Sequence, residues 1–154
     1  MDIQPIALKS LKSAFSLFTK DLNALPAEAY CQSFGPACRT VADIVYEVNL
    51  VNEDLLKTLR GLPQMEWPEG WVTAPEDLRS KEAVLSSFEK LSKEILEVVE
   101  GYTETEMIEP IKSDSSETNR FERCRFMTLH LMYHSGQLNF IQTLLGDDVF
   151  HWAA

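Results

Sequence analysis

Residues 121–147 read FERCRFMTLHLMYHSGQLNFIQTLLGD, and this stretch decides the fold. Its apolar residues recur every three or four positions, which is the spacing of a helix with one buried face. Gly146 suits the position just beyond a helix end, because glycine adopts left-handed backbone angles at little cost. The sequence therefore predicts one long helix over residues 117–145.

Two histidines lie on the apolar side of this helix. At about 100° per residue, His130, His134 and Gln137 fall on one line along it. Met127 and Leu131 flank that line. We therefore expect both imidazoles to point at the core, and because a buried imidazole without a polar partner is costly, something polar must meet them there.

Three further segments show the same helical spacing. Their inward positions are Leu8, Leu11, Phe15, Phe18, Leu22 and Leu25 in the first, Val41, Ile44, Val45, Val48, Val51 and Leu55 in the second, and Val84, Phe88, Leu91, Ile95 and Val98 in the third. Pro26 ends the first helix, on which Asp21 is expected to face water, and Thr40 is an N-cap for the second. Thr73 with Glu76 after it forms a capping box for the third. None of the segments shows the alternation typical of strands.

The connection between the second and third helices is long and punctuated by proline and glycine. We expect its two tryptophans, Trp67 and Trp71, to cap one end of the core. A connection of this kind can span a bundle from end to end. The sequence thus predicts an all-α fold, a four-helix bundle with a long connection between helices 2 and 3, in a single domain over residues 1–154.

Composition and charge narrow the choice of partners. Of 154 residues, 45% are hydrophobic and 25% are charged, the mix of a globular protein. Lys+Arg 14 against Asp+Glu 24 leaves a formal net charge of −10. Binding to nucleic acid or to a membrane surface needs clustered cations, so we expect neither. Small molecules, metal ions or a second copy of the chain are the partners to consider.

The cysteines bear on the compartment. Cys31, Cys38 and Cys124 are odd in number and form no CxxC pair. Scattered thiols of this kind favour a reduced, cytoplasmic location. A Cys31–Cys38 disulfide is the alternative.

The two histidines also match a metal site. Two imidazoles one helical turn apart on the same face can hold one ion between them. The alternative is that His130 and His134 are core histidines, satisfied by backbone, tyrosine or buried carboxylates. A metal needs at least a third protein ligand. Glu47 is the best candidate, because it lies at the border of the second helix's apolar face, about 40° outside it.

Two other side chains are weaker candidates for that third ligand. Asp54 lies along nearly the same line as Glu47 and is held in reserve. His151 follows the helix stop at Gly146 and would have to double straight back. A set of two histidines and one carboxylate leaves positions open for water or substrate, and it suits Zn, Ni, Fe or Mn.

With these residues in view, the chain resembles the DinB-like (DinB/YfiT-like) superfamily of metalloenzymes. The HLMYHSGQLNFIQ core of the last helix is similar to that family's H-x-x-x-H-x-x-Q pattern, and RTVADIVYEVNLVNEDLL resembles its second helix. The resemblance covers nearly the whole chain. It implies a four-helix bundle that commonly forms a homodimer.

The resemblance further implies a divalent metal, often nickel or zinc, bound by one histidine from the second helix and two from the last. His130 and His134 match the pair on the last helix, whereas Glu47 stands where the family usually has histidine. This departure is either an exchange of one ligand for another or the mark of a member that has lost its metal. Some relatives use a low-molecular-weight thiol, as bacillithiol transferases or a mycothiol-dependent isomerase.

Two functions follow. The first is a metal-dependent enzyme acting on a small molecule by thiol-dependent transfer or hydrolysis. Glu47, His130 and His134 would hold the ion, and Gln137 would orient a ligand or hydrogen-bond to one. The second is a non-catalytic, metal-free dimeric bundle, stress-associated or small-ligand-binding, in which the same side chains form a buried polar network.

Overall fold

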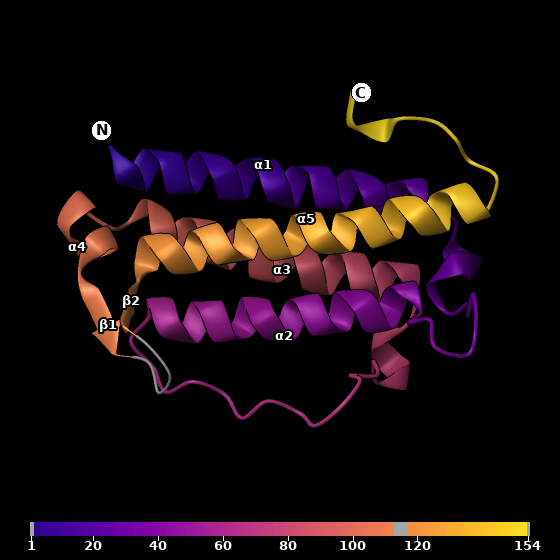
Figure 1. The fold of residues 1–154 in the computed structure, drawn as a ribbon, viewed down its shortest axis with the longest axis horizontal. Coiled ribbons are helices and arrows are strands. Elements are labelled where there is room, and N and C mark those ends of the chain that lie inside the picture. The colour runs from indigo at the N-terminus through magenta and orange to yellow at the C-terminus, as the bar shows by residue number, and fades with distance from the viewer. Residues whose placement is uncertain (1, 113–116, 154) are drawn as a thin grey trace.

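The computed structural model describes residues 2–112 and 117–153 and shows four long helices lying side by side (Figure 1). The helices and strands are α1 (Ile3–Ala24), α2 (Val41–Leu59), α3 (Lys81–Glu100), α4 (Glu104–Ile108), β1 (Pro110–Lys112), β2 (Glu117–Asn119) and α5 (Arg120–Leu144). Single 3-10 turns are η1 (Ala27–Tyr30), η2 (Glu76–Leu78) and η3 (His151–Ala153). The predicted all-α four-helix bundle is confirmed.

Helices α2 and α5 pack on each other and run in opposite directions (Figure 1). In Figure 1, α1 and α5 run in one direction, and α2 and α3 run in the other. The connection between α2 and α3 follows the bundle from one end to the other, as predicted. Helix α5 packs on both α1 and α2, so side chains on its inner face reach both neighbours.

The predicted inward positions form the core. All of them are buried or partly buried, and Leu11, Phe18 and Leu131 are fully buried. Phe88 of α3 packs on Phe18 at a ring-centroid distance of 4.9 Å. Burying one such side chain contributes roughly 1.5–3 kcal/mol, so this interior holds the helices in a fixed register.

Helix α2 begins as predicted, whereas the predicted start of α3 is wrong. The Thr40 hydroxyl accepts from the backbone N–H of Asp43 at 3.2 Å and caps α2. Helix α3 is capped instead by Ser80, whose hydroxyl accepts from the Ala83 N–H. The reason is tertiary: Asp43 accepts from the Ala74 N–H at 2.8 Å and from Arg79 at 3.0 Å. This tie to α2 fixes residues 74–79 outside the helix and overrides the local capping signal at 73–76.

The two tryptophans do not cap the core. Trp67 and Trp71 are 50% and 75% exposed. Trp71 instead lies against the Arg39 guanidinium, whose carbon is 4.3 Å from the ring centroid. The face of a tryptophan ring can bind a guanidinium at the surface as well as pack in a core. The apolar character of Trp67 and Trp71 therefore did not determine whether they are buried.

A short hairpin precedes α5, which begins three residues later than predicted. Strands β1 and β2 pair antiparallel, with Ile111 opposite Thr118. The Asn119 side chain then accepts from the Glu122 N–H at 2.8 Å and caps the helix. Three-residue strands are too short to show an alternating pattern, so they could not be predicted from hydrophobic periodicity.

Asp21 is buried, not exposed to water as predicted. Only 1% of its surface is accessible. Its carboxylate accepts from the Ser135 hydroxyl of α5 and, at 2.7 Å, from the indole N–H of Trp152. The segment after α5 therefore folds back onto α1, where the Lys20 ammonium donates to the Trp152 carbonyl at 3.2 Å. Burial raises the pKa of Asp21, and these hydrogen bonds offset only part of that rise.

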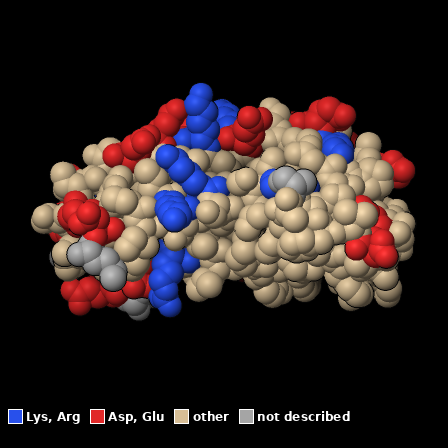
Figure 2. Space-filling model, turned by 90° about the horizontal axis from the view of Figure 1, so that it is seen from above, with Lys and Arg blue, Asp and Glu red and all other residues tan. Residues whose placement is uncertain are grey.

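The surface is uneven in charge. In Figure 2, acidic and basic side chains crowd the left half of the view, whereas much of its lower right carries neither. Several large apolar side chains late in the chain are exposed, among them Tyr133, Phe140, Leu144 and Phe150. In the part of the chain that the structure describes, none of the helices combines the length and apolarity that crossing a membrane requires.

Candidate metal centre

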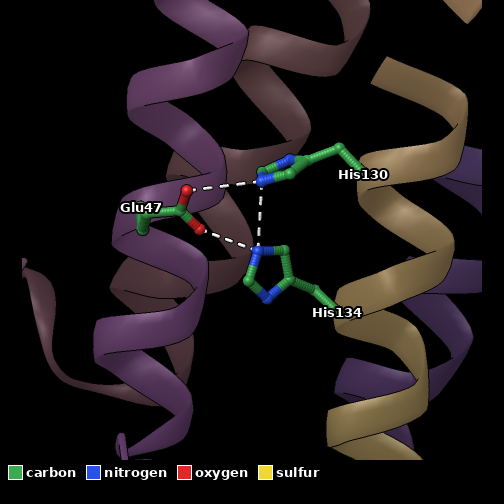
Figure 3. A group of neighbouring side chains, drawn as sticks. All are labelled: Glu47, His130 and His134. Atoms are coloured by element: carbon green, nitrogen blue, oxygen red, sulfur yellow. Dashed lines mark hydrogen bonds and ion pairs between the residues drawn. The ribbon is translucent and has the colours of Figure 1, made fainter. Parts of the chain in front are cut away.

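Helices α2 and α5 bring together the three side chains that the sequence singled out. Glu47 projects from α2 toward α5, and His130 and His134 project from successive turns of α5 toward α2 (Figure 3). Val48 and Leu131, the next residue after Glu47 and the next after His130, are fully buried. Packing of these neighbours fixes both helices around the polar cluster.

The donor atoms of the three residues converge. Glu47 Oε2 lies 2.7 Å from His134 Nε2, and Glu47 Oε1 lies 3.3 Å from His130 Nε2. The two Nε2 atoms are 3.1 Å apart. A tetrahedral ion with bonds of about 2.0–2.2 Å separates its ligand atoms by roughly 3.3–3.6 Å. Small side-chain shifts would therefore open the cluster to hold a divalent ion.

Gln137 fixes the protonation of His134. Its side-chain oxygen lies 2.8 Å from His134 Nδ1, and an amide oxygen can only accept, so Nδ1 carries the hydrogen. In a neutral imidazole the other nitrogen, Nε2, then carries a lone pair. That lone pair faces a carboxylate oxygen of Glu47, which also only accepts. Two acceptors 2.7 Å apart need a proton between them, and a divalent ion could replace that proton once the two atoms moved apart to the separation given above.

The Glu47 carboxylate is stabilised in its charged form. Burial raises the pKa of Glu47, but hydrogen bonds and charges from His130 and His134 outweigh burial and hold that pKa well below its usual range. Arg39 adds a permanent positive charge, because one of its terminal nitrogens lies 3.4 Å from Glu47 Oε2. The Glu47 carboxylate is therefore ionised near neutral pH and can bind a cation.

His130 is held less firmly than His134. Its ring stacks on Phe126 with a centroid distance of 5.8 Å and an interplanar angle of 17°. Its Nδ1 is buried and has no hydrogen-bond partner among the described residues. Metal-bound histidines usually donate that second N–H to an acceptor. His134 has such an acceptor in Gln137, whereas His130 is positioned by its stacking on Phe126 and by the contacts of its Nε2 with Glu47 and His134.

Glu47, His130 and His134 form a group of the described residues that could hold a metal ion. Two imidazole nitrogens and one carboxylate oxygen are a donor set found with several divalent transition metals, so the set itself names no metal. The convergence of three lone-pair atoms on one point is the observation that makes the residues fit an ion.

The other two candidate ligands are used elsewhere. Asp54 is buried and pairs with Arg123 of α5 at 2.6 Å, and it also accepts from the Met65 N–H at 3.4 Å. His151 pairs with Asp147 at 2.9 Å in the segment after α5. Neither residue joins the cluster around Glu47.

Sequence reasoning missed Arg39. This residue directly precedes the N-cap of α2, in a stretch broken by glycine and proline, and no periodic pattern extends to it. Its side chain reaches along α2 to Glu47 while its guanidinium face rests on Trp71. The only available signal was the isolated cation one position before the helix cap.

The family model of the DinB family matches residues 6–151. The chain belongs to the DinB family. Among solved structures it is similar to a DinB-like protein from Bacillus cereus ATCC 10987, with 16% identity and a TM-score of 0.72 over 94% of this chain and 95% of that one. It is also similar to a conserved protein from Enterococcus faecalis, with 13% identity and a TM-score of 0.73 over 96% and 99% of the two chains. At these identities the likeness shows the fold alone.

A search of curated proteins finds no match. Membership of the family therefore supports the fold, and any chemistry must be inferred from the residues of this chain. Within the DinB-family bundle, Glu47 lies opposite His130 and His134 on the facing helix. It stands in the place where the resemblance implies a histidine, and a carboxylate there keeps three donor atoms in the cluster.

Proposed function

We propose that this chain is a divalent-metal-dependent enzyme acting on a small molecule, with the metal held by Glu47, His130 and His134. The observation that carries the proposal is the convergence of three donor atoms from two facing helices, a carboxylate oxygen of Glu47 and the Nε2 atoms of His130 and His134. A divalent ion bound to all three would satisfy their lone pairs. Nickel or zinc is favoured, and iron or manganese is compatible with the same donors.

The chemistry belongs to the ion and the positioning to the chain. A bound divalent metal lowers the pKa of water or of a thiol at its open position and supplies a nucleophile near neutral pH. Gln137 holds the His134 ring in the orientation that aims Nε2 at the site. Tyr133 contacts the His134 ring in a T-shaped arrangement at a centroid distance of 5.0 Å.

The proposed reaction is hydrolysis or transfer to a low-molecular-weight thiol. The site stands beside a cavity of about 640 Å³ that Gln137 and Tyr133 also line. A cavity of this size suits a small molecule.

Three unpaired cysteines, Cys31, Cys38 and Cys124, support the further proposal that the chain works in a reducing, cytoplasmic setting.

Activity assays test this function. Metal-loaded wild type should hydrolyse an activated ester, or transfer a small thiol to an activated aryl chloride, faster than chelator-treated protein. Restoring the metal should restore the rate. The variant His134→Ala should keep its helical circular dichroism and lose the metal-dependent rate. A rate that is equal with and without metal would contradict the proposal.

A second candidate function is a metal-free bundle with a structural polar network. Arg39 favours it, because Glu47 is then neutralised by Arg39 and a protonated His134 without any metal. Nitrogen NMR of the imidazoles in metal-free protein decides: a structural network predicts a protonated Nε2 on His134 and no change when zinc or nickel is added. The metalloenzyme predicts loss of that proton on metal addition.

We also propose that the chain forms a homodimer through the outer face of α5. Phe126 and Leu129 are 50% and 57% exposed there, and apolar side chains grouped on one helix face are typical of protein contacts. Light scattering on the wild type should give twice the mass of the chain, and Leu129→Glu should give a monomer. A monomeric wild type at micromolar concentration would contradict the dimer.

A further inference from the structure

A cavity lies beside the candidate metal centre. Its volume is about 640 Å³. Aromatic rings make up much of its wall: Phe34 comes from the segment before α2, Trp71 from the long connection, and Tyr133 and Phe140 from α5. Three separate parts of the chain thus converge on one apolar hollow, which suits a molecule with a flat apolar body.

One charged residue lines this cavity. Arg39 is the only cation or anion among the described lining residues, although the chain as a whole carries a net charge of −10. The other lining residues with polar side-chain atoms are Cys38, Trp71, Tyr133 and Gln137. A single cation in apolar surroundings attracts an anion more strongly than the same cation in water.

The Arg39 guanidinium has donors to spare. It carries five N–H groups, and the structure assigns one terminal nitrogen to Glu47 at 3.4 Å. Its Nε is buried and has no partner within the described part of the chain. A buried donor without an acceptor is costly, so this atom calls for an acceptor from a ligand or water.

Arg39 is also held in position. Its planar group rests on the Trp71 ring at 4.3 Å, which fixes the plane of the guanidinium and leaves its edge for a planar oxyanion. Glu47 does not use up this charge, because the same carboxylate oxygen lies closer to His134 at 2.7 Å. The guanidinium is therefore a positioned donor beside the site rather than half of a closed ion pair.

We propose that this cavity binds a small aromatic or similarly flat apolar molecule that bears one planar oxyanion, a carboxylate or sulfonate, and that Arg39 binds that group. A ligand of this class would be the substrate of the enzyme proposed above, so the inference rests on that function. Gln137 and Tyr133 line the cavity and contact His134, so the body of the ligand lies next to the metal residues.

Two probes that share an aromatic skeleton test the proposal. Anilinonaphthalene sulfonate carries the anion, and phenylnaphthylamine is its neutral counterpart. Full-length wild type, with or without added zinc, should bind one molecule of each probe with a rise in fluorescence. The variant Arg39→Gln should weaken binding of the sulfonate about tenfold or more, the effect of losing a charge-assisted hydrogen bond, and change binding of the neutral probe less than about twofold.

Two further variants localise the effect. Arg60→Gln removes an equal charge outside the cavity, where Arg60 pairs with Glu94, and should leave both probes unchanged. Gly136→Leu places a side chain at a lining position where an added Cβ meets nothing within 4 Å. It should fold and weaken both probes. Near-ultraviolet circular dichroism of each variant checks that the tertiary structure is native.

Each result decides the proposal. It is overturned if the wild type does not bind the sulfonate, if Arg39→Gln weakens both probes equally or neither, or if Gly136→Leu leaves both unaffected. Metal content of the same samples is measured separately. Loss of the probe pattern with metal retained counts against this inference alone, whereas an intact probe pattern in protein that takes up no metal counts against the enzyme alone.

Discussion

Gln137 accepts a hydrogen bond from His134 Nδ1 over 2.8 Å, one helical turn along α5. That contact determines which nitrogen of His134 has a lone pair, and it turns this lone pair toward Glu47. The chemistry of the cluster therefore depends on a residue outside the three donors.

Gln137→Leu should weaken metal binding about 10–100-fold, the usual effect of removing an acceptor behind a metal-bound histidine. The leucine leaves the three donors in place but no longer fixes the His134 tautomer. Zinc affinity is measured by competition with a chromophoric chelator. Gln137→Glu is the matched control, since it keeps an acceptor oxygen at the same position and should retain the affinity. Equal affinities for wild type and Gln137→Leu would show that Gln137 does not orient the ligand.

Replacements of Glu47 test whether the carboxylate is a ligand. Glu47→Ala should lower zinc affinity by at least about tenfold, because two histidines alone make an incomplete site. Glu47→His should retain binding, since an imidazole at this place on α2 gives the three-histidine set that the family resemblance implies. Both affinities come from the same chelator competition. Metal content unchanged in Glu47→Ala would exclude Glu47 as a ligand.

The Asp54–Arg123 pair should matter for stability and not for metal. Arg123→Met leaves the buried Asp54 carboxylate without its 2.6 Å partner. We expect this change to lower the free energy of unfolding by about 3 kcal/mol, at the low end for a broken buried pair because Arg123 is partly exposed. Urea denaturation measures the loss. Metal content per folded chain should equal that of the wild type, and a fall in it would bring Asp54 back as a ligand.

Asp21 gives the fold a pH dependence of predictable sign. Burial raises its pKa in the folded state, so the folded protein holds the proton more tightly than the unfolded chain. The resulting stabilisation is complete below the unfolded pKa of about 3.9 and is lost as pH rises through the higher folded value. The stability of wild type minus that of Asp21→Asn should therefore decrease from about pH 4 toward neutral pH. A difference that increases over this range would contradict the raised pKa.

Much of the fold and the positions of Glu47, His130 and His134 could be predicted from the sequence, because both depend on helical periodicity. The spacing of His130 and His134 places them on one face whatever packs against it, and the border position of Glu47 on α2 brings it opposite them. Local chemistry also sufficed at Thr40, where a side chain caps the helix that follows it directly. These features depend on residues near in sequence or on one repeating angle.

Features that depend on distant partners could not be predicted. Asp21 lies on a polar border of α1, and its burial depends on Ser135 and Trp152, more than a hundred residues away. The observed start of α3 differs from the predicted one because Asp43 accepts hydrogen bonds from Ala74 and Arg79 in the long connection. Arg39 entered the site through its contacts with Glu47 and Trp71, neither of which any local pattern encodes.

The metal content of the purified protein distinguishes a metalloenzyme from a metal-free bundle. Untagged protein, purified without chelator and without a metal-affinity column, is analysed for its elements beside the double variant His130→Ala/His134→Ala. We expect about one divalent ion per wild-type chain, with nickel or zinc foremost, and almost none in a double variant that keeps its helical circular dichroism. Wild-type protein that holds no divalent metal and takes up neither nickel nor zinc when they are added would contradict this expectation.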